Sequence, residues 1–360
     1  MLGKTPKLCN KVLGSSIRSL ASGRLSTRVA AAFVERTVQI WQLRQCQKLA
    51  QFQTVYDFGG PTGRLAMAPS GDRCAAAAWT AGRRGGVACY EVPSGNLLWH
   101  VPELKQTQYV EFSPDGKCIW CMPETGPTRR LDASTGKVLD ALRGSPRVFA
   151  DPHSSRLLLE YRDKKRDYVL AQDPDYHIQR SGGCIIGAAF SPEALCISEF
   201  GVVRCIDLSL RVEKWRYSLQ NDWVVQSVWH RGLDDRFYGV LDENRRGAFR
   251  GLVRFDEHGT CERLCEFSPS CAEAFCADLD CVVTSSGELI RLADGVEIGR
   301  LAFPQSEYVG IEDFEAWLEA HFDKPRRARA DGGSAPNSHE RDPTLSRSGT
   351  RPAPGRPPGF

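Results

Sequence analysis

The chain repeats a pattern about every forty residues, and this period constrains the fold more than any other feature of the sequence. In the clearest copy, Tyr109–Leu142, two apolar strands joined by Asp115-Gly116 precede a third strand, the turn Thr135-Gly136 and a short fourth strand. Both dipeptides mark tight turns, because glycine tolerates positive φ. The turn prolines lie 45, 38 and 40 residues apart, at Pro69, Pro114, Pro152 and Pro192. Four strands in such a period are typical of one blade of a β-propeller.

Seven copies of this pattern follow one another along the sequence. They span Ser16–Phe52, Arg64–Val101, Tyr109–Leu142, Arg147–Arg180, Ile185–Leu219, Val224–Phe267 and Cys271–Phe303. A single blade buries too little surface to be stable alone, whereas blades packed in a ring share a core. We therefore predict an all-β fold, a seven-bladed β-propeller over residues 16–304. Six blades with an accessory N-terminal sheet is the alternative, and the pattern leaves open whether the terminal strands interlock.

The ends of the chain differ from the repeats. Residues 1–15 are interpreted as an N-terminal leader. Residues 308–322 predict an amphipathic helix, because its apolar residues fall at helical spacing: Ile311, Phe314, Trp317, Leu318 and Phe322. We expect this helix to pack on the propeller, with docking in a partner's groove as the alternative. Residues 323–360 are rich in Pro, Gly, Ser and Arg, which predicts a disordered tail.

Several stretches resemble a known family of repeats. "VEFSPDGKCIWCM", "LDASTGKVLDAL" and "TVQIWQL" are similar to WD40-type repeats, and the resemblance covers roughly residues 16–304. The chain departs from that pattern, since no Gly-His pair begins a blade and no Trp-Asp pair ends a third strand. "DASTG" at Asp132–Gly136 and "SGNLLW" at Ser94–Trp99 also resemble the repeats of quinoprotein propellers. The resemblance implies a propeller that presents loops to a protein.

Composition and charge narrow the class of protein. The net charge is +3, but residues 323–360 carry eight basic and four acidic residues, or +4, so residues 1–322 carry −1. Nothing in the sequence is long and apolar enough to span a bilayer, so we expect no membrane partner. The fourteen cysteines are expected to be reduced, and we predict a cytoplasmic location.

The residue types that perform chemistry show no catalytic or metal-binding pattern. Cys118 and Cys121 lie three apart on a predicted strand and so point to opposite faces. The denser run of Cys261, Cys265, Cys271, Cys276 and Cys281 is better explained by packing than by metal binding. No P-loop, nucleophile elbow or dinucleotide fingerprint occurs. We predict no catalytic residue, no metal and no cofactor, with a quinoprotein-like enzyme as the alternative.

Three predicted loops between second and third strands are basic and should emerge on one face of the ring. They are residues 80–86, 162–167 and 242–251, with charges of +2, +2 and +1. Their candidate partner-binding residues are Arg83, Arg84, Arg162, Lys164, Lys165, Arg166, Arg245, Arg246 and Arg250. Such loops favour an acidic protein segment or a phosphate-rich partner. Nucleic acid is not expected, because residues 1–322 are nearly neutral and no aromatic stacking pattern accompanies the loops. We therefore predict a non-enzymatic protein-binding scaffold; a structural subunit of a fixed assembly is a further alternative.

Overall fold

A computed structural model describes most of the repeat region. The described residues are 13–15, 17–33, 36–56, 58, 64–78, 85–104, 107–123, 126–144, 146–151, 154, 156–161, 168–181, 183–219, 223–242, 249–267 and 273–307. All of them belong to one compact unit, Val12–Tyr308. The predicted C-terminal helix, the predicted tail and most of the predicted leader lie outside the described residues.

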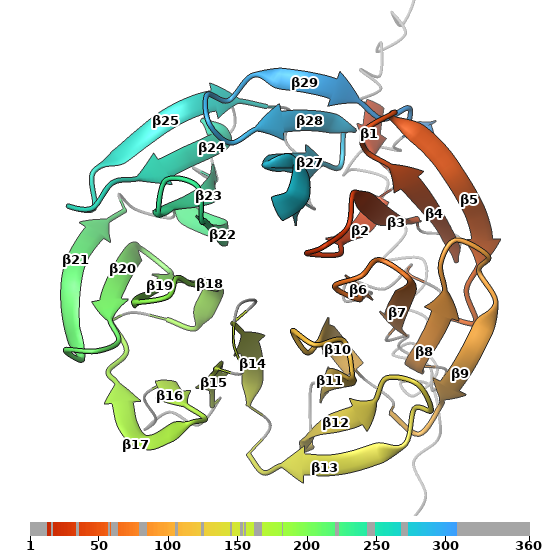
Figure 1. The fold of residues 1–360 in the computed structure, drawn as a ribbon, viewed down its shortest axis with the longest axis horizontal. Helices are drawn as coiled ribbons and strands as arrows, with labels where there is room; N and C mark the ends of the chain where they lie inside the picture. The colour runs from red at the N-terminus through yellow and green to blue at the C-terminus, as the bar shows by residue number, and fades with distance from the viewer. Residues whose placement is uncertain are drawn as a thin grey trace, which may run out of the picture. The chain divides into compact units, whose positions relative to one another are not determined.

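Seven four-stranded antiparallel sheets form a closed ring, so the prediction of a seven-bladed propeller is confirmed (Figure 1). Blade 1 holds β2 (Ile17–Ser22), β3 (Arg28–Phe33), β4 (Thr37–Gln42) and β5 (Gln47–Gln53). Blade 2 holds β6 (Arg64–Met67), β7 (Arg73–Ala78), β8 (Gly86–Glu91) and β9 (Leu97–Val101). Blade 3 holds β10 (Thr107–Phe112), β11 (Cys118–Pro123), β12 (Thr128–Asp132) and β13 (Val138–Leu142).

The remaining four blades repeat the same order of strands. Blade 4 holds β14 (Arg147–Ala150), β15 (Leu157–Glu160), β16 (Tyr168–Leu170) and β17 (Asp173–Ile178). Blade 5 holds β18 (Ile185–Phe190), β19 (Ala194–Glu199), β20 (Val202–Asp207) and β21 (Val212–Ser218). Blade 6 holds β22 (Val224–Arg231), β23 (Arg236–Asp242), β24 (Arg250–Phe255) and β25 (Cys261–Glu266). Blade 7 holds β26 (Glu273–Cys276), the 3-10 turn η1 (Ala277–Leu279), β27 (Cys281–Thr284), β28 (Glu288–Arg291) and β29 (Glu297–Arg300).

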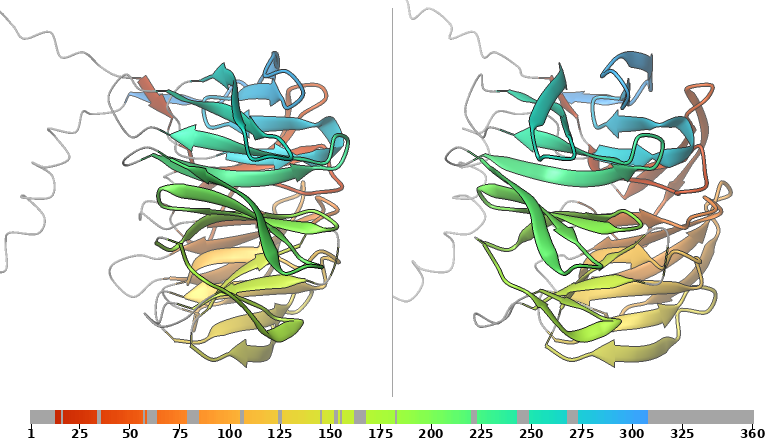
Figure 2. Two further views of the ribbon diagram at one scale, coloured as in Figure 1. Left: turned by 90° about the vertical axis from the view of Figure 1, so that its left-hand side faces the viewer. Right: turned by 60° about the vertical axis from the view of Figure 1, so that its left-hand side comes forward.

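The ring closes without exchange of strands between blades. Each blade consists of four consecutive strands, and the two chain ends meet separately, where β1 (Leu13–Ser15) pairs antiparallel with β30 (Gln305–Glu307). β1 therefore falls inside the segment that the sequence assigned to a leader. The side views show the blades stacked around the ring with their turns at two opposite faces (Figure 2).

The core consists of seven apolar clusters, one between each pair of neighbouring blades. Blades converge toward the axis, so the inner strands carry small side chains, as in the "RVAAAF" of β3 and the "RCAAAA" of β7. Farther out, wider spaces hold Trp41, Phe52 and Trp215. Both sides of an inner strand are covered by neighbours, which is why every residue of β19 and β20 is buried.

Candidate functional site

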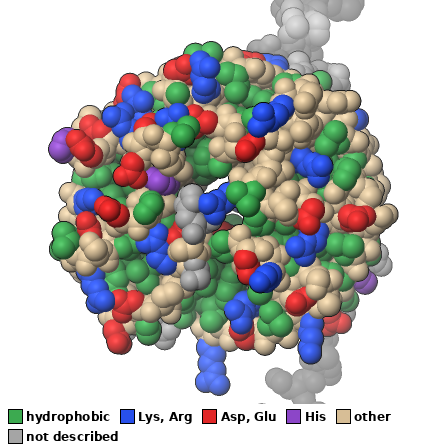
Figure 3. Space-filling view, viewed as in Figure 1, with side chains coloured by type: hydrophobic (Ala, Val, Ile, Leu, Met, Phe, Trp, Pro, Cys, Tyr) green, Lys and Arg blue, Asp and Glu red, His purple; other side chains and the backbone are tan. Residues whose placement is uncertain are grey.

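The seven innermost strands surround an axial cavity of about 420 Å³ that opens on one face of the ring. Its walls come from β2, β10, β14, β18, β22 and β26, at the ends where first strands turn into second strands. A hollow of about 290 Å³ adjoins it and adds residues of β6; the two share Arg24, Glu111 and Ala150. The space-filling view of this face shows the ring hollowed at its centre (Figure 3).

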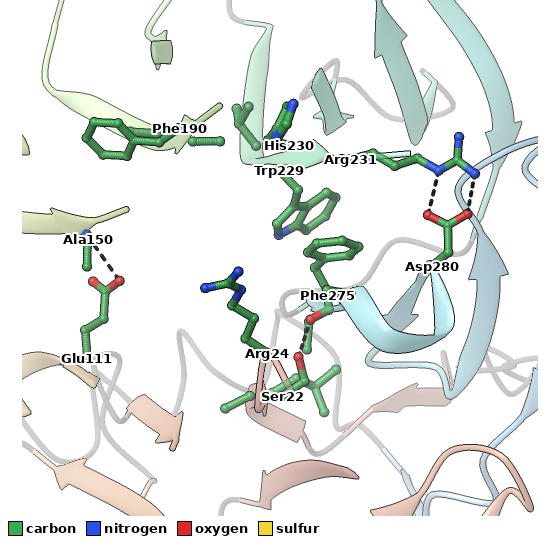
Figure 4. A pocket seen from close by; sticks show the side chains of 18 of the residues that line it. Ser22, Arg24, Glu111, Ala150, Phe190, Trp229, His230, Arg231, Phe275 and Asp280 are labelled. Carbon is green, nitrogen blue, oxygen red and sulfur yellow. Dashed lines mark hydrogen bonds and ion pairs between the residues drawn. The ribbon is translucent and has the colours of Figure 1, made fainter. Parts of the chain in front are cut away.

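Arg24 and Glu111 bring charge into the cavity. Figure 4 shows the Arg24 side chain extending into the space bounded by Glu111, Phe190 and Trp229. Arg24 lies in the turn between β2 and β3, and burial lowers its pKa while Asp151 opposes that shift. Its guanidinium is thus a cation in a partly dehydrated space, where an opposite charge is attracted more strongly than in water.

Glu111, in β10, is a carboxyl group that titrates near neutral pH. Its Oε1 accepts a hydrogen bond of 3.4 Å from the Ala150 N–H. Burial raises the pKa of Glu111 to about 7, although that hydrogen bond and Arg147 both lower it. At neutral pH this group can therefore either donate or accept a proton in a hydrogen bond with a bound group.

One wall of the cavity is aromatic. The rings of Trp229 (β22) and Phe275 (β26) lie side by side, with centroids 5.9 Å apart and an angle of 39° between them. Phe190 of β18 also lines the cavity but is fully buried, with the Arg156 guanidinium 5.3 Å from its ring centroid. The half-buried rings of Trp229 and Phe275 are flat apolar surfaces that can accept another ring or an aliphatic side chain.

The rim beside this wall is held by a network of ion pairs. Arg231 binds Asp280 through Nε at 2.6 Å and Nη2 at 2.7 Å, and Asp234 through Nη1 at 2.7 Å. The bonds to Asp280 first, and those to Asp234, raise the pKa of the guanidinium above its usual value. Tyr238 donates to Asp234 at 2.6 Å. This network joins blade 6 to blade 7 and fixes the mouth of the cavity.

Two leucines stand exposed in the turns at the mouth. Leu25 and Leu233 are 72% and 79% exposed, and they follow the first strands of blades 1 and 6. Leu233 also lines the cavity. Leucine at such exposure gains from being covered, so the mouth combines apolar surface with the half-buried charges of Arg24 and Glu111.

The second strands β7, β15 and β23 run away from the mouth of the cavity, and the predicted basic loops follow them in the sequence. Of their candidate residues, Arg83, Arg84, Arg162, Lys164, Lys165, Arg166, Arg245 and Arg246 lie outside the described residues. Arg250 is described, at the start of β24, and its guanidinium binds Asp242 at 2.8 Å, Glu273 at 2.9 Å and Gln226 at 3.1 Å. Glu273 belongs to β26, so Arg250 connects blade 6 to blade 7. Partner binding by the basic loops stays a prediction.

The other chemistry-bearing residues are dispersed. The described cysteines are all thiols, and Cys276 and Cys281 of the predicted dense run face each other across a strand pair. Within the described residues, no group of three or more His, Cys, Asp or Glu could hold a metal ion. No helix among them is long and apolar enough to cross a membrane.

Sequence reasoning missed the residues of the cavity. Glu111 lies within β10 and Arg231 ends β22, and both strands carry other polar residues, so a charge at these positions gives no distinctive local signal. Arg24 sits in a turn, where arginine is unremarkable. Comparison with known families and curated proteins finds no matching family model and no matching curated protein. The resemblance to WD40-type repeats therefore stays a prediction carried by the motifs, while the propeller fold itself is established.

Proposed function

We propose that the chain is a non-enzymatic protein-binding scaffold whose docking site is the face around the axial cavity. The proposal rests on one observation: a preformed cavity, with Arg24 and Glu111 inside and an aromatic wall, opens between the exposed Leu25 and Leu233. A propeller is commonly used as an interaction scaffold, and a rigid ring loses little conformational entropy when it binds.

The combination of groups at the mouth suits a protruding protein segment. The exposed leucines would be covered by the partner's backbone and apolar side chains, while one side chain enters the cavity. Arg24 favours an acidic or carbonyl-rich end on that side chain, in keeping with the expected acidic partner. The described cysteines are all thiols, which supports a reducing, cytoplasmic location for this complex.

Affinity capture from a native lysate tests the docking face. The tagged wild-type chain is compared with a Leu25→Asp/Leu233→Asp variant, in which two charges replace the apolar rim. The control is Leu97→Asp/Leu98→Asp on the outer strand β9, where the two leucines are 46% and 44% exposed. We expect a stoichiometric protein with the wild type and the control, and its loss with the rim variant.

A six-site variant distinguishes the two faces. It replaces Arg83, Arg84, Lys164, Lys165, Arg245 and Arg246 of the basic loops with uncharged residues. Capture lost in this variant but kept in the rim variant would overturn the axial docking site and favour the basic loops. A small molecule retained in place of a protein would favour the quinoprotein-like enzyme.

A further inference from the structure

A second hollow, of about 460 Å³, lies between blades 4 and 5, away from the axial cavity. One side is formed by residues 176–181, which comprise the end of β17 and the segment after it. The other side is formed by Arg204 and Ile206 of β20, by Arg211 just before β21, and by Glu213 and Arg216 within β21. We call this hollow the arginine groove.

Guanidinium groups dominate the lining. Among the described residues, four arginines line the groove, and each is paired with a carboxylate: Arg180 with Glu160, Arg204 with Glu199 and Glu213, Arg211 with Asp173, and Arg216 with Glu213. Arg211 and Arg216 have side chains 55% and 48% exposed, whereas that of Arg204 is 5% exposed. The groove therefore has exposed cations at its opening and a buried one within.

Two buried donors in this groove have no acceptor among the described residues: Nε of Arg180 and Nη2 of Arg204. The other atoms of Arg204 are engaged, with Nε 2.8 Å from Glu199 and Nη1 3.5 Å from Glu213. Buried donors are nearly always satisfied in folded proteins, so two such atoms in one groove point to an acceptor that comes from outside.

Both donors belong to one cluster around the carboxylate of Glu199. This carboxylate already accepts hydrogen bonds from the Tyr168 hydroxyl at 2.6 Å and from the Ser181 N–H at 3.1 Å. The Arg180 guanidinium lies over the ring of Tyr168, 5.2 Å from its centroid, and also donates to the Tyr161 carbonyl. Arg180 and Arg204 thus both contact the Tyr168–Glu199 pair, and Arg180 also lies 3.9 Å from the Glu160 carboxylate.

The shape and edge of the groove suit an extended peptide. Among the described strands, β17 is the last of its sheet and pairs only with β16, which leaves one edge of its backbone available to another chain. Residues of that strand and the segment after it line the groove in sequence. A peptide lying along this edge would carry its side chains past the guanidinium groups.

We propose that the arginine groove binds a phosphorylated residue within an extended segment of a protein partner. A phosphate monoester has three terminal oxygens and up to two charges. It can therefore accept hydrogen bonds from several arginines at once, whereas a carboxylate is matched by the paired N–H donors of a single guanidinium group. The inference rests on the proposed scaffold function only in that the occupant is a protein segment. It concerns a separate site.

Direct titration of the purified full-length chain tests the groove alone. A five-residue phosphoserine peptide with blocked ends is titrated by calorimetry at low salt, beside the same peptide with unmodified serine. We expect saturable binding of the phosphopeptide only. Arg180→Gln should weaken that binding about tenfold, the effect of losing a charge-assisted hydrogen bond.

Arg73→Gln is the matched control. The Arg73 side chain is 23% exposed, close to the 25% of Arg180, and it too donates to a backbone carbonyl, that of Gly116 at 3.0 Å. This control should bind the phosphopeptide as the wild type does. Arg216→Gln, at an exposed ion pair, is a second groove variant should Arg180→Gln fail to fold, and it too should weaken binding.

Three results would overturn the proposal. They are no binding of the phosphopeptide, equal binding of both peptides, and unchanged binding by a folded groove variant. Vesicles containing a phosphoinositide form a further arm; binding to these vesicles without binding to the peptide would show a lipid headgroup as the occupant and also overturn it. None of these results bears on capture at the axial face, so the two proposals fail separately.

Discussion

At the scale of single residues, Glu111 couples the axial cavity to pH. Its raised pKa means that the folded chain holds the proton more tightly than the unfolded chain between the ordinary value of 4.5 and about 7. Stability therefore falls as pH rises through this window and stays lower above it. This lower stability arises at a carboxyl group that faces both a backbone N–H and the open space in which a partner's side chain would lie.

We expect Glu111→Gln to remove this pH dependence. The amide keeps an acceptor for the Ala150 N–H but does not ionise. As pH rises from 5 to 8, the free energy of unfolding of the wild type should therefore fall by roughly 2–3 kcal/mol relative to that of the variant. Urea unfolding at both pH values measures the difference. Glu91→Gln is the control, because hydrogen bonds from Ser94 and Asn96 lower the pKa of the exposed Glu91. Parallel pH profiles of Glu111→Gln and the wild type would refute the assignment.

Arg250 should contribute to stability whether or not it also meets a partner. Its side chain is 12% exposed and that of Glu273 is 3% exposed, so Arg250→Gln removes one ion pair of a buried carboxylate. We expect a loss of about 3 kcal/mol in the free energy of unfolding. Arg44→Gln, at a pair with Asp278 in which the side chains are 56% and 44% exposed, should cost less than about 1 kcal/mol. Equal losses in the two variants would contradict this account.

At the scale of elements, the turn between third and fourth strands packs on the outer strand of the preceding blade. Gly95, Gly136 and Gly259 adopt positive φ in these turns, and a Cβ there would meet the rings of Phe52, Trp99 and Trp215, respectively. Two other blades reach the same contact differently. Arg211 adopts positive φ and its guanidinium lies over the ring of Tyr176. Cys46 also adopts positive φ, and its Sγ lies against Gly299.

Gly136→Ala tests this contact. A Cβ at Gly136 would lie 2.7 Å from the Trp99 ring, so the substitution adds a clash to the strain of positive φ. Gly201 has a similar φ of 78° but nothing within 4 Å of such a Cβ, so Gly201→Ala reports the strain alone. We expect about 1–2 kcal/mol of destabilisation for Gly201→Ala and about 1–3 kcal/mol more for Gly136→Ala. Thermal unfolding compares them, and equal shifts would argue against the contact.

These turns also show what sequence could and could not predict. Gly95 and Gly136 follow serine and threonine between apolar runs, a local signal that located the blades and their number. Arg211 at positive φ carries no such signal, although the strands around it were still recognised. Arg24 and Glu111 come from blades 1 and 3, and only closure of the ring brings them to one cavity. Their meeting depends on tertiary geometry, which the periodicity does not encode.

At the scale of the whole molecule, the seven interfaces between blades are unequal. Among the described residues, the cluster between blades 3 and 4 has four buried members: Trp120, Met122, Val148 and Leu159. The cluster that closes the ring between blades 7 and 1 has thirteen. Because apolar burial is the main stabilising contribution, the ring should open first beside blade 4 rather than where the chain ends meet.

Hydrogen exchange of the isolated chain tests this order of opening. We expect the amides of β14–β16 to exchange faster than those of β18–β20, which belong to a blade that is buried on both sides. The strands β2 and β26 at the closure should exchange slowly. Fastest exchange in those two strands would place the weak point at the closure instead.

A hydrogen-exchange footprint of the chain bound to its captured protein partner locates the docking face. Docking at the axial cavity should slow exchange in the turns around it, at residues 23–27, 232–235 and 277–280, with the outer strands unchanged. Protection confined to the opposite ends of the strands or to the outer strands would show that the partner docks elsewhere and would contradict the axial site.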